Sequence, residues 1–398
     1  IDNDKNLTAF IVEKSFGGIT FNEPENKLGI KGSDTRQVFF TDCQVPVENM
    51  LSERENGFKI AVNILNIGRI KLAASNIGAS KGAINHSVKY ANERKQFGTA
   101  ISNFGAIKHK LAQQAIKVFA CESAAYRAGQ NIDDAIEAFV ANGMDEATAK
   151  LKSFEQFAIE CAMLKVHGSE VLDYVVDETV QIFGGMGYSA DAPAERCYRD
   201  SRINRIFEGT NEINRMLCVG TVIKRALKGE LGLMNAILEV QKELTAEGGE
   251  GSGGNAFFDY EHKLVNNLKK ATLITAGAAV QKFGNNLSNE QEVMMNLADM
   301  MIETYVAESV VLRVEKLVAL RGQEACALQI DMARVYLNDA LDKTCFAGKQ
   351  AIAAFAEGTM YGGLMKGLSR FCRAEAYNAK EARRRVAEHL IKENQYNF

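Results

Sequence analysis

The chain has 398 residues, of which 46% are hydrophobic and 24% charged, and its formal net charge is -3. This balance is typical of a folded protein with a sizeable core, long enough for two or three domains. The near-neutral charge is spread along the chain, which excludes the basic footprint of a nucleic-acid-binding protein. Three prolines, no tryptophan and abundant helix formers favour a mainly α fold.

Metal-binding and membrane-spanning patterns are missing from the sequence. The eight cysteines and five histidines are scattered, and they form neither a CxxC nor an HExxH motif. This spacing argues against a metal site and for reduced thiols. No run of about twenty apolar residues occurs, so we expect no membrane-spanning helix.

The first fifty residues show the pattern of short strands. Residues 7–13, 19–21 and 38–40 are rich in β-branched and aromatic residues, and glycines separate them. Three short strands cannot bury both faces of a sheet alone. We therefore expect residues 1–50 to be the end of a β-domain, and the chain to be the C-terminal part of a longer polypeptide.

Helical periodicity begins after Pro46 and predicts a helical bundle over residues 51–241. The Gly184-Gly185 pair is expected to end one of its helices as a C-cap and turn. The predicted helices cover residues 55–93, 104–130, 146–167, 169–183 and 211–228.

The stretch 242–256 is rich in Gly, Ser and Glu and is expected to be a linker. A second all-α domain is expected over residues 257–398, with helices at 260–283, 289–321, 324–347 and 374–393. Its last helix carries Arg383-Arg384-Arg385, for which a solvated basic face is favoured over a membrane-surface patch.

Glu208 is the first of three places where the sequence could carry chemistry. It lies between Phe207 and Gly209-Thr210, just before a predicted helix. On spacing alone, a carboxylate there is a helix cap or a partner of the helix dipole. A general base at this place would instead have to be partly removed from water by apolar neighbours.

The other two places are helix ends. Residues 181–185 (QIFGG) predict a turn, and they also expose backbone N–H groups that could approach a phosphate or a planar ring. Residues 93–98 (ERKQFG) end an earlier helix, where Arg94 is either a dipole partner or a bidentate clamp for a pyrophosphate.

In this order the three motifs resemble the acyl-CoA dehydrogenase family. The resemblance rests on residues 94–98 (RKQFG), 181–188 (QIFGGMGY), 198–200 (YRD) and 207–210 (FEGT), and it covers residues 1 to about 230. Residues 27–30 and 34–36 resemble the closing strands of that family's middle β-domain. The helical extension and Asn103-Phe104-Gly105 resemble its very-long-chain branch.

The resemblance implies a flavoprotein that oxidises a long or very-long-chain acyl-CoA to the trans-2-enoyl-CoA in β-oxidation. Glu208 matches the base that removes the α-proton while a hydride leaves the β-carbon for flavin N5. Its backbone N–H would help to polarise the thioester carbonyl. Some relatives carry the base immediately before the arginine that matches Arg69, but Gly68 occupies that position here.

The resemblance also implies binding roles for other residues. Arg69 and Gly209 match substrate contacts, although Arg69 could also form an ordinary ion pair. Without the family, Thr210 or Asn211 would be read as an N-cap. The implied FAD contacts are Arg94, Gln96, Phe97, Gln181, Ile182, Phe183, Gly184 and Gly185 toward the neighbouring subunit's cofactor, and Thr210, Asn211 and Glu212 toward the chain's own.

These roles imply a homodimer or higher oligomer and electron-transfer flavoprotein as the electron acceptor. Peripheral membrane contact by the last domain stays open, and bacterial cytoplasm is favoured over the mitochondrial matrix or inner membrane. The family's N-terminal helical domain and flavin-gripping strands would precede Ile1, so we expect this chain alone to bind FAD poorly. A non-catalytic scaffold relative and an oxygen-using acyl-CoA oxidase are the alternatives.

Overall fold

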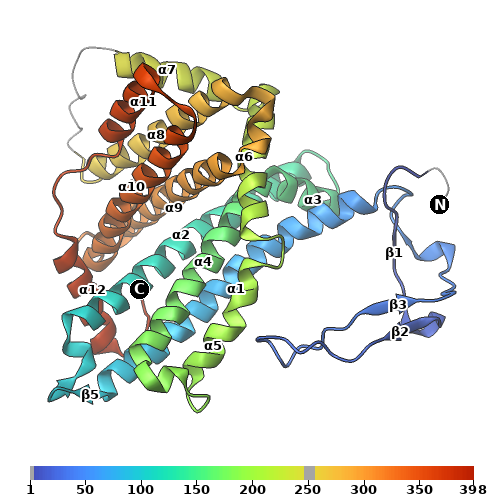
Figure 1. Cartoon of the computed structure of the whole chain (residues 1–398), viewed down its shortest axis with the longest axis horizontal. Coiled ribbons are helices and arrows are strands. Elements are labelled where there is room, and N and C mark those ends of the chain that lie inside the picture. Colours follow the sequence, from blue (N-terminus) through green and yellow to red (C-terminus); the bar gives the residue numbers. More distant parts are fainter. Residues whose placement is uncertain (1–3, 246–255) are drawn as a thin grey trace.

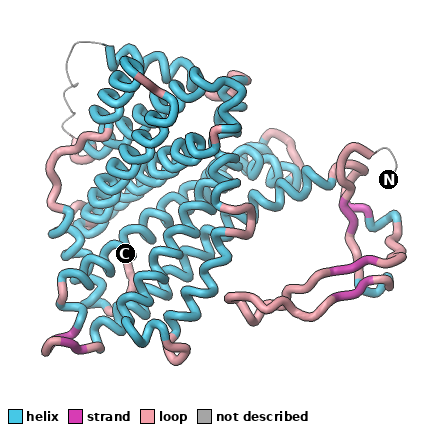
Figure 2. The backbone as a smooth tube through the Cα atoms, in the orientation of Figure 1, coloured by secondary structure: helices cyan, strands magenta, loops and turns pink. Residues whose placement is uncertain are grey.

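The computed structural model describes residues 4–245 and 256–398 and is mainly helical, as predicted (Figure 1, Figure 2). The helices are α1 Gly57–Glu93, α2 Gly105–Ala141, α3 Glu146–Gln156, α4 Ala158–Phe183, α5 Pro193–Ser201, α6 Asn211–Leu227, α7 Leu233–Thr245, α8 Asp259–Phe283, α9 Gln291–Arg321, α10 Ala327–Phe355, α11 Gly358–Phe371 and α12 Ala379–Glu393. The strands are β1 Ala9–Phe10, β2 Ile19–Phe21, β3 Val38–Phe40, β4 Met50–Leu51, β5 Lys95–Gln96 and β6 Thr99–Ala100.

The N-terminal strands form an arm that projects from the start of α1 and runs back toward α5 (Figure 1). β1 pairs with β4 and β2 with β3, both antiparallel, and β2 and β3 coincide with two predicted strands. The tip of the arm reaches α5, because Asp200 accepts a hydrogen bond from the Ile30 N–H at 2.6 Å and Arg199 donates to the Leu28 carbonyl. The 198–200 motif therefore holds the arm beside the helices.

The packing of α1 against α4 corrects one predicted boundary. The sequence placed a helix break at Gly168, whereas α4 runs unbroken through it and the break lies at Phe157, between α3 and α4. Gly168 faces α1 so closely that a Cβ there would lie 3.2 Å from Cα of Ala73. The glycine thus serves close helix packing rather than a turn.

The two helical units share one hydrophobic core. A single cluster of buried apolar residues joins α1, α2 and α4 to α8, α9, α10 and α12. A second cluster joins α6 to helices α7 to α11. The division at the linker stays a prediction, and residues 246–255 of that linker lie outside the described residues.

Three described helices were not predicted. They are α5, α7 and α11, and all are short. α11 contains Gly362, Gly363 and Gly367, which lower helix propensity and hid its pattern. Gly367 allows close packing in the folded chain, because the Leu244 side chain lies 3.0 Å from the position that a Cβ would occupy.

The arginine run on α12 is only partly a solvated face. Arg383 donates to both carboxylate oxygens of Asp339 on α10 and to the Gln113 side chain on α2, and its side chain is 15% exposed. Arg385 makes a bidentate pair with Asp331 on α10. Arg384 and Arg385 nevertheless remain exposed, as expected, and Arg384 pairs with Glu381 on its own helix.

We therefore predict that Arg383→Met lowers the free energy of unfolding by about 1–3 kcal/mol, because Asp339 and Gln113 lose their partner. Arg384→Met is the matched control and should change it by less than about 0.5 kcal/mol. Urea denaturation followed by circular dichroism measures both values. Equal effects of the two changes would contradict this assignment.

Candidate active site

The loop before α6 has an unusual backbone. Glu208 and Gly209 have φ values of +60° and +82°, so a non-glycine residue takes the left-handed conformation beside a glycine. The side-chain amide of Asn214 is fully buried, and its Nδ2 lies 3.3, 2.7 and 3.0 Å from the carbonyl oxygens of Glu208, Gly209 and Thr210. Asn214 thereby ties three consecutive carbonyls to the first turn of α6.

Arg69 supports the same loop from α1. Its Nε donates to the Glu208 carbonyl at 3.2 Å, and its Nη1 donates to Asn66 Oδ1 at 2.9 Å. The residue is 4% exposed, and burial lowers the pKa of its guanidinium. In this structure Arg69 holds the loop, while its implied contact with substrate stays a prediction.

The Glu208 carboxylate lies over Gly68. A Cβ at position 68 would come within 2.7 Å of Glu208 Cδ, and closer still to Oε2. Glu208 is half-buried, and within residues 4–245 and 256–398 its carboxylate makes no hydrogen bond or ion pair with protein. A half-buried, uncommitted carboxylate is available to accept a proton.

The capping alternative for Glu208 is wrong, because another residue caps α6. The Thr210 hydroxyl accepts from the Ile213 N–H at 3.3 Å. The pKa of Glu212 is lowered by its own backbone N–H and by the Thr210 hydroxyl. These two residues thus satisfy the start of the helix and leave Glu208 free.

Asn211, the first residue of α6, faces the interior. Its side chain accepts from Lys165 Nζ at 2.7 Å and contacts Ser169 and Glu170, all on α4. Lys165 is fully buried, and burial lowers its pKa to about 8. Neither Lys165 nor Asn214 was singled out from the sequence, although a lysine inside the apolar run 161–166 was a usable signal.

A second group of predicted residues lies around an open hollow of about 490 Å³ where α1 and α4 end. Arg94 and Gln96 line it from the α1 side, and Ile182, Phe183, Gly184 and Gly185 line it from the α4 side. Gly184 caps α4 with φ +58°, as predicted, and a Cβ at either glycine would meet open space. Backbone can therefore approach a ligand closely here.

Two aromatic rings are among the residues that line this hollow. Phe183 stacks on Tyr90 with ring centroids 4.1 Å apart. Gln181 and Phe97 are exposed and do not line the hollow. Phe97 is 93% exposed and has a φ of +53° at the tip of the β5–β6 hairpin. Tyr90, Ile101 and Met186 also line the hollow and were not among the predicted site residues.

The hollow and Glu208 are far apart on one chain. Residues 68 and 94 are separated by about 39 Å along α1, at 1.5 Å per residue. The structure thus brings the predicted residues together as two groups, one around the 208–214 loop and one around Arg94. A single cofactor ring cannot touch both groups of the same chain.

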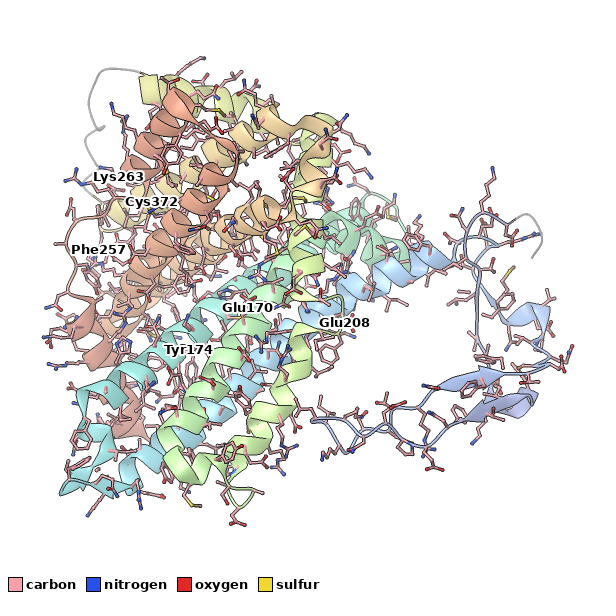
Figure 3. The ribbon with its side chains drawn as sticks, viewed as in Figure 1. Glu170, Tyr174, Glu208, Phe257, Lys263 and Cys372 are labelled. Atoms are coloured by element: carbon pink, nitrogen blue, oxygen red, sulfur yellow. The ribbon has the colours of Figure 1, made fainter. Side chains whose placement is uncertain are left out.

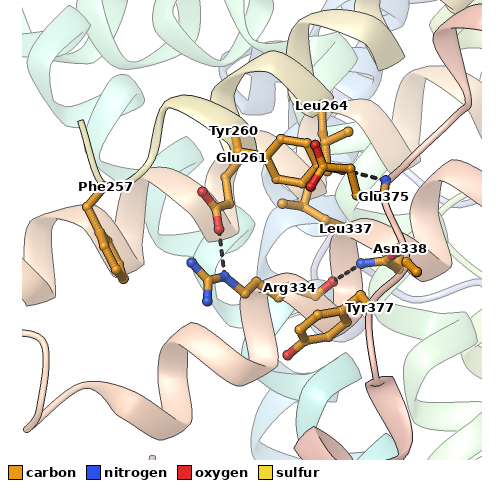
Figure 4. A pocket seen from close by; sticks show the side chains of 10 residues that line it. Phe257, Tyr260, Glu261, Leu264, Arg334, Leu337, Asn338, Glu375 and Tyr377 are labelled. Atoms are coloured by element: carbon orange, nitrogen blue, oxygen red, sulfur yellow. Dashed lines mark hydrogen bonds and ion pairs between the residues drawn. The ribbon is translucent and has the colours of Figure 1, made fainter. Parts of the chain in front are cut away.

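Another hollow, of about 190 Å³, lies in the second helical unit (Figure 4). Its lining includes Phe257, Tyr260 and Tyr377, and an ion pair in which Arg334 donates to the buried Glu261 at 2.6 Å. These two charges neutralise each other, and the other carboxylate in the lining, that of Glu375, belongs to an exposed residue. Across the described residues, no cluster of His, Cys, Asp and Glu is arranged to hold a metal ion. None of the described helices has the length and hydropathy of a membrane span.

Two parts of the chain match the family described as "Acyl-CoA dehydrogenase, C-terminal domain", namely residues 55–222 and 267–370. A probable acyl-CoA dehydrogenase of Bacillus subtilis (strain 168) is 41% identical over 396 residues, which is 100% of this chain and 66% of the relative. The mitochondrial very long-chain specific acyl-CoA dehydrogenase of Rattus norvegicus is 39% identical over 78% of this chain and 47% of its own length.

A crystal structure of an acyl-CoA dehydrogenase complexed with FAD from Bacillus anthracis superposes with a TM-score of 0.94. It is 39% identical to this chain, and the match covers 99% of this chain and 67% of that one. Nearly the whole described fold is therefore shared with a relative of clear sequence similarity. The chain belongs to the acyl-CoA dehydrogenase family.

Proposed function

We propose that this chain carries the catalytic base and part of the cofactor site of an FAD-dependent acyl-CoA dehydrogenase. The observation that carries the proposal is the uncommitted Glu208 carboxylate over Gly68, on a loop tied by Asn214 and Arg69. Glu208 Oε would accept the α-proton of an acyl-CoA thioester. Arg69 and Asn214 both bind the backbone carbonyl of Glu208, so the loop is held in place while the carboxylate stays free to react.

The Glu208 backbone N–H supports a second role for this residue. Among the described residues it has no protein acceptor, so it is free to donate to an incoming carbonyl oxygen. A donor aimed at a thioester carbonyl stabilises the negative charge that forms when the α-proton leaves. One residue would then withdraw the proton and stabilise the resulting charge.

The hollow beside Arg94 fits part of an FAD molecule. Arg94 has no acidic partner within the described residues, and a free guanidinium is suited to a pyrophosphate. Gly184 and Gly185 leave room for close backbone approach, and the stacked Tyr90 and Phe183 offer an aromatic wall. When bound, FAD supplies the hydride acceptor for the β-carbon.

The distance between Glu208 and Arg94 favours a shared site in a homodimer or higher oligomer. Arg94 and Gln96 would serve the cofactor beside the partner's Glu208, while Thr210, Asn211 and Glu212 would serve the chain's own side. Because Asn211 is buried, its side chain would act by holding the loop. The exposed Phe97, in a strained conformation at a hairpin tip, is suited to burial against a second subunit.

Long or very-long-chain acyl-CoA is the proposed substrate class, because the very long-chain specific relative of Rattus norvegicus is 39% identical over 78% of this chain. Measuring kcat/KM with acyl-CoA substrates of increasing chain length decides the substrate class.

Electron-transfer flavoprotein is the proposed electron acceptor, and bacterial cytoplasm is the proposed location. Peripheral membrane contact by the last domain stays a prediction, which vesicle co-sedimentation tests.

In the natural, full-length protein, Glu208→Gln should keep FAD and lower kcat for palmitoyl-CoA by about 10²- to 10⁴-fold, because the amide cannot accept the proton. The exposed Glu239→Gln is the control and should match wild type. Substantial turnover by Glu208→Gln would refute the base, and a scaffold would show no turnover even in wild type. Peroxide release that is independent of electron-transfer flavoprotein would favour the oxidase.

Gly68→Ala should lower kcat about tenfold with an unchanged melting temperature. The new methyl group would displace the Glu208 carboxylate, and the flexible end of that side chain can rotate away with little strain. Gly78→Ala, on the same helix with nothing within 4 Å, is the matched control. A kcat within twofold of wild type would show that the carboxylate does not act from this place.

Arg94→Gln should raise the dissociation constant for FAD by about tenfold or more, because a charge-assisted hydrogen bond is lost. Lys95→Gln changes the neighbouring exposed cation and should leave FAD affinity within twofold of wild type. Flavin fluorescence titration of the natural, full-length apoprotein measures both. Equal losses would mean that general charge, rather than the Arg94 guanidinium, attracts the cofactor.

A further inference from the structure

We propose that Asp299, on α9 of the second helical unit, is a positioning residue for Glu208 that acts through Arg215 and Glu170. This inference rests on the proposed function, because it concerns the loop that carries the base. Asp299 would thereby give the second helical unit a part in catalysis, although that unit does not carry the base.

Arg215 is the centre of the connection. It lies on α6, its side chain is 13% exposed, and its Nε donates to Asp299 Oδ1 at 2.7 Å. Its two terminal nitrogens bind the two oxygens of Glu170 on α4, at 2.8 and 3.1 Å. One guanidinium therefore joins three helices, two from the first unit and one from the second.

Glu170 continues the connection to the catalytic loop. Its Oε1 accepts from Nδ2 of Asn211 at 3.1 Å, and Asn211 is the first residue of α6, three positions after Glu208. Figure 3 shows Glu170 and Glu208 in the middle of the molecule, where α4 meets α6. Arg215 and Asn211 are one helical turn apart, so a rotation of α6 moves both residues and the loop before them.

The charges explain why Asp299 matters. Burial opposes the charge of Arg215, but Glu170 and Asp299 outweigh burial and raise the pKa of the guanidinium. The ionised guanidinium is thus held by a carboxylate on each of two helices. Without the Asp299 charge, Arg215 keeps only Glu170 and can turn about that single pair. The position of α6 against α4 is then less restricted.

Asp299 does not act on the reacting atoms. Its hydrogen bond goes to Arg215, and burial raises the pKa of its carboxyl above the ordinary value although Arg215 opposes the rise. Its side chain is 43% exposed, so an asparagine of the same shape fits the site. Asp299→Asn thus removes the charge while the packing of α9 is kept, which makes it a clean test.

In the natural, full-length protein, Asp299→Asn should lower kcat for palmitoyl-CoA by about 2- to 30-fold, with KM, FAD content and melting temperature little changed. Amides of residues 207–212 should exchange hydrogen faster, as measured by mass spectrometry, since the loop is less restrained. Asp342→Asn, an exposed carboxylate on α10 of the same unit, is the control and should match wild type in both measurements.

A double variant tests the route. Arg215→Gln should lower kcat at least as much as Asp299→Asn, and adding Asp299→Asn to it should have no further effect on kcat or exchange. Additive effects would overturn the route through Arg215. A kcat within twofold of wild type in Asp299→Asn, or a loss of melting temperature without a loss of kcat, would overturn the positioning role.

The proposed function can fail separately. If wild type does not turn over acyl-CoA, or Glu208→Gln equals wild type, the proposed function fails. The exchange measurement still reports on the connection, because it needs no activity. If wild type is active and Glu208→Gln is not, while Asp299→Asn equals wild type in both measurements, only the present inference fails.

Discussion

Two hydrogen bonds to one carbonyl oxygen determine the geometry of the site. The Glu208 carbonyl accepts from Arg69 on α1 and from Asn214 on α6, so the loop is held between two helices. A left-handed backbone at a non-glycine residue costs roughly 1–2 kcal/mol and persists only where its surroundings impose it. Here the imposed conformation turns the carboxylate toward Gly68. The packing of α1 and α6 around the loop thus sets the direction of the Glu208 side chain.

The helices were predicted well where apolar periodicity was strong, and less well where glycine had a packing role. Gly184 ended α4 as expected, because a positive φ at a helix end requires glycine. Gly168 looked the same in sequence, yet it lies inside α4 against Ala73. Gly184 has a positive φ and faces open space, whereas Gly168 is helical and packs against α1, which is a contact between distant parts of the chain. Local sequence does not contain that information.

The site shows the same limit. Spacing alone favoured Glu208 as a cap, and only the order of three motifs favoured a base. The structure explains the difference, because Thr210 satisfies the helix start and leaves Glu208 uncommitted. Lys165 and Asn214 escaped notice since their roles depend on partners from other elements or on a folded loop. A buried lysine in an apolar run is, however, a signal that sequence reading can use.

Helix α4 serves both groups of site residues. Its middle carries the side chains that hold Asn211, and its end carries Ile182, Phe183 and the Gly184 cap at the Arg94 hollow. Because α4 has no break at Gly168, it is one continuous helix between the residues that hold Asn211 and the Arg94 hollow. In the proposed oligomer, α4 of each subunit would extend from the catalytic loop of that subunit to the cofactor of the neighbouring subunit. Each active centre would then depend on two chains. When a chain with a substituted Glu208 is mixed with a chain with a substituted Arg94, one centre of the mixed oligomer would contain both residues intact.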